Sequence, residues 1–210
     1  ASAIRKLVPF ADAAKKQGVK VYHLNLGQPD IKSPACALDA VRNFSQENVS
    51  YSHSAGLMEL RKGLVEKYYK KIGIDLTVDE LIVTVAGSES VNLALEIACN
   101  PGDEVIVLEP FYTNYNTFAF MNGLTLKAIP TDIRNGFQIP PIEEFEKAIT
   151  EKTKAILVCN PGNPTGTQYS KESMLALGEI ARRHDLFLLS DEVYREFCYT
   201  DEPHFSAMNI

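Results

Sequence analysis

The chain has 210 residues, of which 45% are hydrophobic and 23% are charged, and its formal net charge is −6. This balance predicts a globular protein with at least one sizeable core and excludes compositional disorder. An acidic chain without a basic run gives no reason to expect a nucleic-acid partner. No apolar stretch approaches the roughly 20 residues of a membrane helix, so we expect no membrane partner either.

The N-terminal stretch, ASAIRKLVPFADAAKKQG, is basic and amphipathic and lacks the apolar block and cleavage site of a signal peptide. We therefore expect the protein in the cytoplasm. The cysteines are widely spaced and form no C-x-x-C pair, which predicts reduced, structural cysteines and no metal site. They are Cys36, Cys99, Cys159 and Cys198.

The first eighty residues show no regular alternation of strands and helices. After the N-terminal helix they read as an extended piece, VYHLNLGQPD, followed by helices near 34–47 and 56–72. We interpret residues 1–50 as an N-terminal arm with part of a smaller domain, and residues 51–210 as the first portion of a large domain.

From residue 81 onward, short runs rich in Val, Ile and Leu alternate with longer helix-like segments. The expected strands are 81–85, 104–108, 155–159 and 186–190, and the expected helices are 88–99, 141–150 and 170–183. Ser170 is expected to cap the last of these helices. The alternation predicts an α/β fold, a mostly parallel sheet covered by helices.

Ligands of open parallel sheets bind beyond the carboxyl ends of the strands, so the residues that follow each strand are of interest. Strand 81–85 is followed by Ala86, Gly87 and Ser88, which open a helix. Small residues let a ligand approach the backbone, and free N–H groups with a favourable dipole suit a phosphate. A helix cap is the structural alternative for this stretch.

The other strand ends supply further polar and aromatic groups. Tyr112 follows strand 104–108, Asn163 follows strand 155–159 within NPGNPTG, and Asp191 and Tyr194 follow strand 186–190. Each has a structural explanation of its own: a core aromatic, a turn, a cap or a packing residue. Their joint occurrence at successive strand ends favours a ligand site.

The chain as a whole resembles a known family. The segments that carry the resemblance are LGQPD at 26–30, Y-x-x-x-x-G-x-x-x-L-R at 51–61, TVAGSES at 84–90, PGDEVIVLEPFY at 101–112, NPGNPTG at 160–166 and SDEVY at 190–194. In this order they are similar to the class I/II aminotransferases of the pyridoxal-phosphate fold type I, the aspartate-aminotransferase-like enzymes. The resemblance covers nearly the whole chain.

The resemblance implies a role for each matching residue. Ala86, Gly87 and Ser88 would hold the phosphate of pyridoxal 5′-phosphate, and Tyr112 would stack on its pyridine ring. Two further residues, Asn163 and Tyr194, would hydrogen-bond the ring's phenolic oxygen.

Three more positions complete the implied site. Asp191 would pair with the ring nitrogen, Gly27 would lie over the substrate together with Asn163, and Tyr51 would reach the cofactor phosphate of a partner subunit. Asp191 and Tyr194 are the implied catalytic residues, and Tyr51 implies a homodimer.

Elementary chemistry agrees with these roles. Pyridoxal phosphate is an electron sink that works best with a protonated ring nitrogen, and a carboxylate such as Asp191 raises that nitrogen's pKa. Donors at Asn163 and Tyr194 stabilise the phenolate form of the ring oxygen. The family often places cis peptides near this edge, so we expect at least one of the Glu109-Pro110 and Asn163-Pro164 bonds to be cis.

The Schiff-base lysine of the family is absent from this chain. In the family it lies a few dozen residues beyond the D-x-x-Y motif, in Ser-x-x-Lys, and here the sequence stops sixteen residues after Tyr194. Two arginines, at the phosphate and at the substrate carboxylate, are absent as well. We therefore expect these residues to be a truncated, inactive part of an active parent enzyme.

Three functional readings stay open. The first is an aminotransferase that moves an amino group between an L-amino acid, aspartate or a broad range, and a 2-oxo acid. The second keeps fold and cofactor but ends in elimination, as in C–S lyases and aminocyclopropane-carboxylate synthases. The third is a non-catalytic regulatory module with this fold.

Overall fold

The computed structural model describes residues 5–25 and 27–210. The chain consists of two units, Ala1–Leu57 and Met58–Ile210, each of which is described by itself. The predicted division into residues 1–50 and 51–210 stays a prediction, because a division by compactness does not assign a residue to an arm or to a cofactor domain.

The first unit contains short helices and extended chain. A 3-10 turn η1 (Arg5–Leu7) leads into α1 (Val8–Lys16), and α2 (Ala35–Arg42) follows the extended segment. Both predicted helices are present, although the second is shorter than the range 34–47. Neither helix contains a buried residue.

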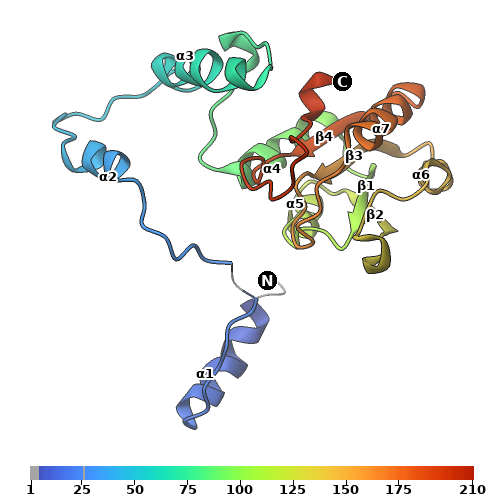
Figure 1. Ribbon diagram of the computed structural model, residues 1–210, viewed down its shortest axis with the longest axis horizontal. Coiled ribbons are helices and arrows are strands. Elements are labelled where there is room, and N and C mark those ends of the chain that lie inside the picture. Colours follow the sequence, from blue (N-terminus) through green and yellow to red (C-terminus); the bar gives the residue numbers. More distant parts are fainter. Residues whose placement is uncertain (1–4, 26) are drawn as a thin grey trace. The chain divides into compact units, whose positions relative to one another are not determined.

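The second unit is built on a parallel sheet (Figure 1). Its strands are β1 (Glu104–Glu109), β2 (Thr125–Pro130), β3 (Thr153–Cys159) and β4 (Phe187–Asp191). They lie in the order β2-β1-β3-β4, and every neighbouring pair runs parallel. The predicted fold class is confirmed, and all four carboxyl ends lie at one edge of the sheet.

Alternate residues of the strands face two different cores, as the pleat requires. Val105 and Leu157 pack with Tyr115 on one face, whereas Ile106 and Ile156 belong to the core on the other face. Because both faces are covered, the central strands are apolar on successive positions rather than on every second one.

The helices divide between the two faces. The helices α4 (Gly87–Ala98) and α5 (Tyr115–Met121) contribute to the first core, and α6 (Ile142–Ala148) and α7 (Lys171–Arg183) to the second. Ser170 caps α7, since its Oγ accepts a hydrogen bond from the Ser173 amide at 3.2 Å, as predicted.

A helical segment precedes the sheet. It comprises α3 (Met58–Lys67), η2 (Tyr69–Ile72) and η3 (Val78–Glu80), so the helix expected over 56–72 is interrupted at Tyr68. Two further short 3-10 turns are η4 (Ile133–Asn135) and η5 (Ala207–Asn209). None of the helices in the described residues is long and apolar enough to cross a membrane.

The prediction of a strand at 81–85 is wrong for this structure. These residues belong to no strand, although Leu81 has extended dihedral angles, and the side chains of Ile82 and Val85 are exposed. A strand requires a neighbour with which to exchange backbone hydrogen bonds, and in the described part of the chain this segment has none. Strand β2 and helix α5 are present in addition to the elements predicted from the sequence.

Candidate functional site

Residues 160–166, which follow β3, form a turn that contains two prolines. The peptide bonds Asn160-Pro161 and Asn163-Pro164 are cis, as is Glu109-Pro110 after β1. The prediction that at least one of the bonds at Pro110 and Pro164 is cis is therefore confirmed. The strand ends and the polar turn begins at the same carboxyl edge of the sheet.

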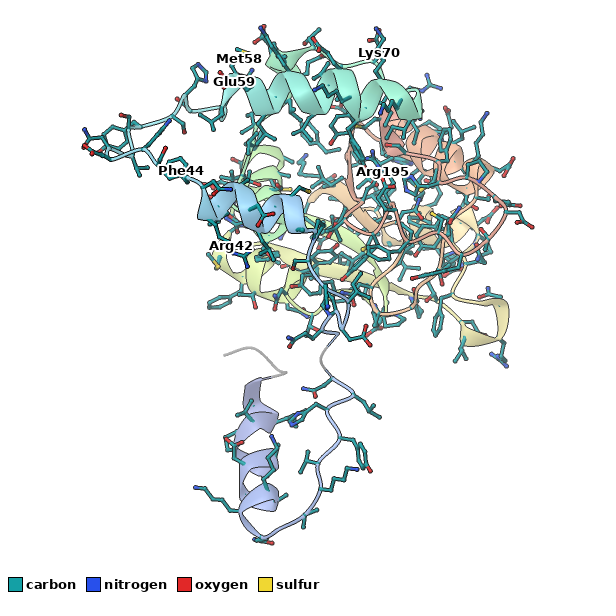
Figure 2. The ribbon with its side chains drawn as sticks, turned by 60° about the vertical axis from the view of Figure 1, so that its left-hand side comes forward. Arg42, Phe44, Met58, Glu59, Lys70 and Arg195 are labelled. Atoms are coloured by element: carbon teal, nitrogen blue, oxygen red, sulfur yellow. The ribbon has the colours of Figure 1, made fainter. Side chains whose placement is uncertain are left out.

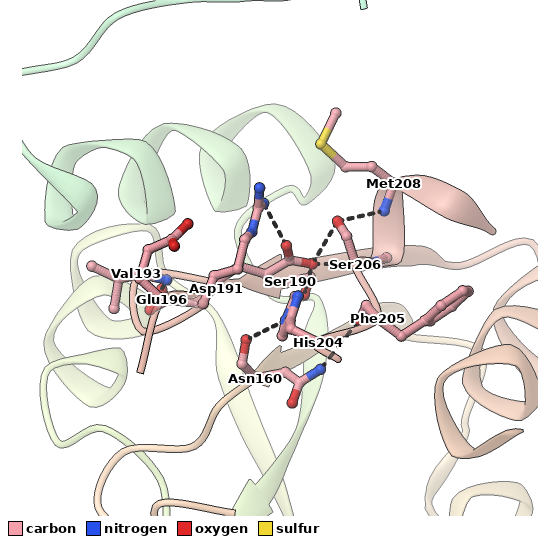
Figure 3. A network of polar contacts seen from close by, with 12 residues as sticks. Asn160, Ser190, Asp191, Val193, Glu196, His204, Phe205, Ser206 and Met208 are labelled. Carbon is pink, nitrogen blue, oxygen red and sulfur yellow. Dashed lines mark hydrogen bonds and ion pairs between the residues drawn. The ribbon is translucent and has the colours of Figure 1, made fainter. Parts of the chain in front are cut away.

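Asn160 is the structural member of this turn. It is 0% exposed, and its Oδ1 accepts a hydrogen bond from the Tyr169 amide at 3.0 Å. Its backbone carbonyl accepts from His204 Nε2 at 3.0 Å, and its Nδ2 donates to the Phe205 carbonyl at 3.5 Å (Figure 3). Asn160 therefore connects three segments of the chain, and its fully buried side chain lines neither of the cavities described below.

Asn163 and Tyr194, predicted as a pair from opposite strand ends, lie side by side. Asn163 Nδ2 donates to the Tyr194 hydroxyl oxygen at 3.2 Å. Asn163 is half-buried, and Tyr194 is 37% exposed. Both groups retain hydrogen-bonding capacity and access to solvent, so they can serve a ligand atom between or beside them.

Asp191 ends β4 and is held on both carboxylate oxygens. Tyr115 Oη donates to Asp191 Oδ2 at 2.8 Å, and the Val193 amide donates to Oδ1 at 3.3 Å. The partners fix the plane of the carboxylate at the edge of the sheet. Each carboxylate oxygen can accept more than one hydrogen bond, so a ligand N–H can still be bound.

Tyr112 lies next to Tyr115, the residue that donates to Asp191. Its ring meets the Tyr115 ring edge-on, with 5.5 Å between the centroids, and its hydroxyl oxygen accepts a hydrogen bond from Asn114 Nδ2 at 2.7 Å. A T-shaped contact with Tyr115 occupies at most one face of the Tyr112 ring. The ring is half-buried and fixed at both ends.

Ala86, Gly87 and Ser88 stand at the beginning of α4, as predicted. Ala86 is the N-cap residue, and no side chain caps the helix there. A Cβ placed on Gly87 would meet nothing within 4 Å. The start of α4 therefore combines first-turn N–H groups with open space, which suits a phosphate group.

A cavity of about 570 Å³ connects the start of α4 with the end of β4. Gly87 and Ser90 line it on one side and Asp191 on the other, with Glu192 and Arg195 beside Asp191. Asn163 and Tyr115 line a second, small cavity that also reaches Cys159. Gly87 and Asp191 therefore share one cavity, whereas Asn163 lines the other and Tyr112 and Tyr194 line neither. A single pocket that holds all the predicted residues stays a prediction.

Two acidic groups next to Asp191, the Cys159 thiol and the Tyr115 phenol, have raised pKa values, chiefly because they are buried. Burial, followed by the negative charge of Asp191, raises the pKa of the Cys159 thiol to about 11. Burial also raises the pKa of Tyr115 far above its usual range, with Cys159 and Asp191 adding to the effect. Both groups therefore stay protonated at neutral pH.

Tyr51 and Gly27 lie in the first unit, and their relation to the site stays a prediction. The Tyr51 side chain is fully exposed, and nothing lies within 4 Å of a Cβ built on Gly27. The roles implied for the other residues stay predictions too. All four cysteines are free, with Cys99 and Cys159 buried.

Sequence reasoning missed Tyr115 and Glu192. Tyr115 stands three residues after Tyr112, at the first position of α5, and a predicted helix there would have directed attention to it. Glu192 belongs to the segment SDEVY, but nothing in the sequence indicates that its side chain is almost fully buried.

A helix-covered parallel sheet whose strand ends bring together polar and aromatic side chains defines an α/β protein with a candidate ligand site at the carboxyl edge. A family profile described as aminotransferase class I and II matches residues 19–209. The chain belongs to this family.

Relatives of known sequence and structure agree. The aspartate/prephenate aminotransferase of Thermus thermophilus is 38% identical over 197 residues, which cover 93% of this chain and 51% of that protein. The solved aspartate aminotransferase of Thermus thermophilus with maleate is 36% identical with a TM-score of 0.88, covering 99% of this chain and 54% of that one. An alanine aminotransferase from Pyrococcus furiosus, 34% identical, reaches a TM-score of 0.90 over 99% of this chain and 53% of its own. The chain thus spans about half the length of these relatives.

Proposed function

We propose that the protein to which this chain belongs is a pyridoxal-phosphate-dependent aminotransferase that transfers an amino group between an L-amino acid and a 2-oxo acid. The observation that carries the proposal is the convergence of the helix start at Gly87, the Asp191 carboxylate and the Asn163–Tyr194 pair at one edge of the sheet. The family of the chain supports it.

The residues present fit the cofactor. Open space at Gly87, together with the first-turn amides of α4, would receive the phosphate. The Asp191 carboxylate would accept a hydrogen bond from the protonated ring nitrogen, and Tyr112 offers an aromatic ring. Asn163 Nδ2 and the Tyr194 hydroxyl would donate to the phenolic oxygen. When bound, the cofactor withdraws electrons from the α-carbon of the substrate amino acid.

The protein's part is to bind and orient. Asp191 would hold a proton on the ring nitrogen, because a nearby negative charge raises that nitrogen's pKa. Tyr115 and the Val193 amide keep the carboxylate in place for this task. The Asn163–Tyr194 pair would lower the proton affinity of the phenolic oxygen. These groups are fixed by the fold before a ligand binds, which reduces the ordering that binding requires.

We further propose aspartate, or a broad range that includes it, as the amino acid. The support is the naming of the relatives as aspartate aminotransferases and the maleate, a dicarboxylate, together with which the Thermus thermophilus enzyme was solved. We also propose that the protein is a homodimer in the cytoplasm. The homodimer is supported by the fully exposed side chain of Tyr51 and by the absence of buried residues in α1 and α2.

Substitution of one glycine tests the cofactor site. In the full-length protein, Gly87→Ala should weaken pyridoxal phosphate binding at least about tenfold, because the methyl group occupies the space left for the phosphate. Gly63→Ala is the matched control: Gly63 lies in α3, and a Cβ there also meets nothing within 4 Å. Absorbance titration measures both, and equal affinities would contradict the proposed site.

The reaction is tested separately with the same full-length protein. Incubation with aspartate should release the 2-oxo acid and leave the cofactor as pyridoxamine phosphate. Release of ammonia and pyruvate from an amino acid would instead show elimination. An absence of any cofactor binding would support the regulatory module and overturn the proposal.

A further inference from the structure

The Glu192 carboxylate is a buried charge between the two predicted catalytic residues. Its side chain is 8% exposed, and it accepts four hydrogen bonds. Oε1 accepts from Ser190 Oγ at 3.0 Å, Ser206 Oγ at 3.1 Å and the Ala207 amide at 2.8 Å. Oε2 accepts from Arg195 Nη2 at 2.7 Å. Such a complete set of partners is what a buried carboxylate requires.

Arg195 is buried with it. Its side chain is 12% exposed, and its guanidinium lies over the rings of Tyr68 and Tyr69, 5.8 and 5.5 Å from their centroids. Figure 2 shows Arg195 near the end of the helical segment that contains Lys70. The Arg195 Nε and Nη1 atoms are buried without a hydrogen-bond partner. Glu192 is therefore the carboxylate that neutralises this cation.

The pair lies beside the site. Glu192 directly follows Asp191 in the chain, and Arg195 directly follows Tyr194. The Arg195 amide donates to the Glu192 carbonyl at 3.0 Å, so the turn is closed by backbone and side chain alike. Figure 3 shows Asp191 and Ser190 at this turn, with Ser206 approaching from the C-terminal segment.

Two carboxylates line the cavity that Arg195 also lines, those of Asp191 and Glu192. Arg195 also lines a neighbouring cavity together with Glu196, whose carboxylate already accepts a hydrogen bond from the Tyr68 hydroxyl. Inside the first cavity, a guanidinium released from Glu192 would have Asp191 as the other anion. An arginine paired with Asp191 would compete with a ligand N–H for the carboxylate and would oppose a positive charge on the ring. The charge of Glu192 therefore affects whether the Asp191 carboxylate is available to a ligand N–H.

We propose that Glu192 is a positioning residue that keeps Arg195 away from Asp191 and thereby reserves the Asp191 carboxylate for the cofactor's ring nitrogen. This inference rests on the proposed function. It assigns to Glu192 a role in the chemistry of the site in addition to anchoring the turn. Arg195 takes part as the cation that must be held, not as a ligand-binding group.

The test compares single and double substitutions in the full-length protein. Glu192→Gln keeps the size of the side chain and removes the charge, so Arg195 is released. Binding of pyridoxamine phosphate should weaken roughly 10- to 100-fold, and the pH dependence of its bound absorption should shift to lower pH, because the ring nitrogen loses its proton more easily. In the double variant Glu192→Gln/Arg195→Gln the competing cation is gone, so most of the affinity and the original pH dependence should return.

Matched controls separate this role from a structural one. Glu179→Gln breaks an ion pair of the same spacing, with Arg182 on the exposed face of α7, and should leave binding and spectrum unchanged. Thermal unfolding is measured for every variant. A purely structural Glu192 would lower the melting temperature of the single and double variants alike, without recovery of the spectrum in the double variant.

Three results would overturn the inference. The first is wild-type affinity and spectrum for Glu192→Gln, and the second is a double variant that binds no better than the single one. Glu192→Asp serves if Glu192→Gln does not fold, since it keeps the charge but shortens the reach to Arg195. It should weaken binding in the same direction, and wild-type binding would be the third contrary result. If the wild-type protein binds no pyridoxal phosphate, the proposed function fails first, and this inference falls with it.

Discussion

Tyr115 donates a hydrogen bond from its phenol to Asp191 Oδ2 across 2.8 Å, although the two residues stand 76 positions apart in the chain. The Tyr115 side chain is 1% exposed and belongs to the core beneath β1 and β3. The contact thus joins the hydrophobic core to the carboxylate that is proposed to control the cofactor ring. In the proposed function Tyr115 is a positioning residue, since it would act through Asp191.

Replacement of Tyr115 by phenylalanine measures this hydrogen bond. Tyr115→Phe keeps the ring in the core but leaves Asp191 Oδ2 without its protein donor. The free energy of unfolding at pH 7 should fall by about 1.5 to 3 kcal/mol, the usual range for a hydrogen bond to a charged group. Urea titration followed by circular dichroism measures the change.

Tyr169→Phe is the control for that experiment. Tyr169 is also a buried phenol, 6% exposed, and no hydrogen bond of its hydroxyl to Asp191 is present. Its replacement should cost less than Tyr115→Phe. Equal losses for the two variants would show that burial of a phenol, rather than the bond to Asp191, determines the effect.

Stability at alkaline pH depends on Cys159. Its pKa is about 11 in the folded protein against an ordinary value of 9.0, chiefly because of burial. The folded state therefore binds more protons than the unfolded state between about pH 9 and 11, and the free energy of unfolding falls as the pH rises through that window. Below about pH 9 the contribution is fully present.

Cys159→Ala should flatten this part of the pH profile. The wild-type protein should lose roughly 2 to 3 kcal/mol more than the variant between pH 9 and 11, since one pKa unit corresponds to about 1.4 kcal/mol. The slopes are compared rather than the absolute values, because the variant also loses packing. Parallel profiles would show that the Cys159 thiol ionises equally in both states.

Much of the fold follows from local patterns in the sequence. Strands β1, β3 and β4 are largely apolar runs, and helix α7 begins at a recognisable cap, Ser170. Strand β2, with the sequence TLKAIP, carries a lysine and a proline and lies at the edge of the sheet, where it needs less apolar surface. This weaker apolar pattern explains why the sequence does not predict strand β2.

The candidate site shows the same division. Gly87, Tyr112, Asn163, Asp191 and Tyr194 could be selected because each follows a strand-like run, and strand ends meet at one edge of a parallel sheet. The contact of Tyr115 with Asp191 could not be predicted in this way, because it depends on how α5 packs under the sheet. The segment 81–85 failed for a related reason: its pattern is that of a strand, but pairing is a property of the neighbours.

Removal of the α7 cap tests a purely local prediction. Ser170→Ala deletes the oxygen that accepts from the Ser173 amide, and the free energy of unfolding should fall by about 1 kcal/mol. Ser170→Asp should retain most of the stability, because aspartate also caps helices well. A loss of equal size in both variants would mean that the Ser170 hydroxyl acts through contacts other than the cap.

Substitution of the two asparagines in the turn after β3 should lower the free energy of unfolding by different amounts. Asn160→Ala leaves the buried Tyr169 amide without its acceptor and also removes the donor to the Phe205 carbonyl. We expect the free energy of unfolding to fall by about 2 to 4 kcal/mol. Asn163→Ala removes only the 3.2 Å contact with Tyr194 at a half-buried position, so its effect should stay below about 1 kcal/mol.

Cofactor binding should be affected more by the Asn163 substitution than by the Asn160 substitution. Asn163→Ala removes a donor proposed for the phenolic oxygen, so the full-length variant should bind pyridoxal phosphate more weakly, with a shifted absorption spectrum, while it unfolds almost as the wild type does. Asn160→Ala, once folded at low temperature, should retain the wild-type spectrum, because the Asn160 side chain is fully buried and lines neither cavity of the site. If Asn163→Ala left both affinity and spectrum unchanged, this turn would be a structural feature throughout, and the site would have to depend on Asp191 and the start of α4 alone.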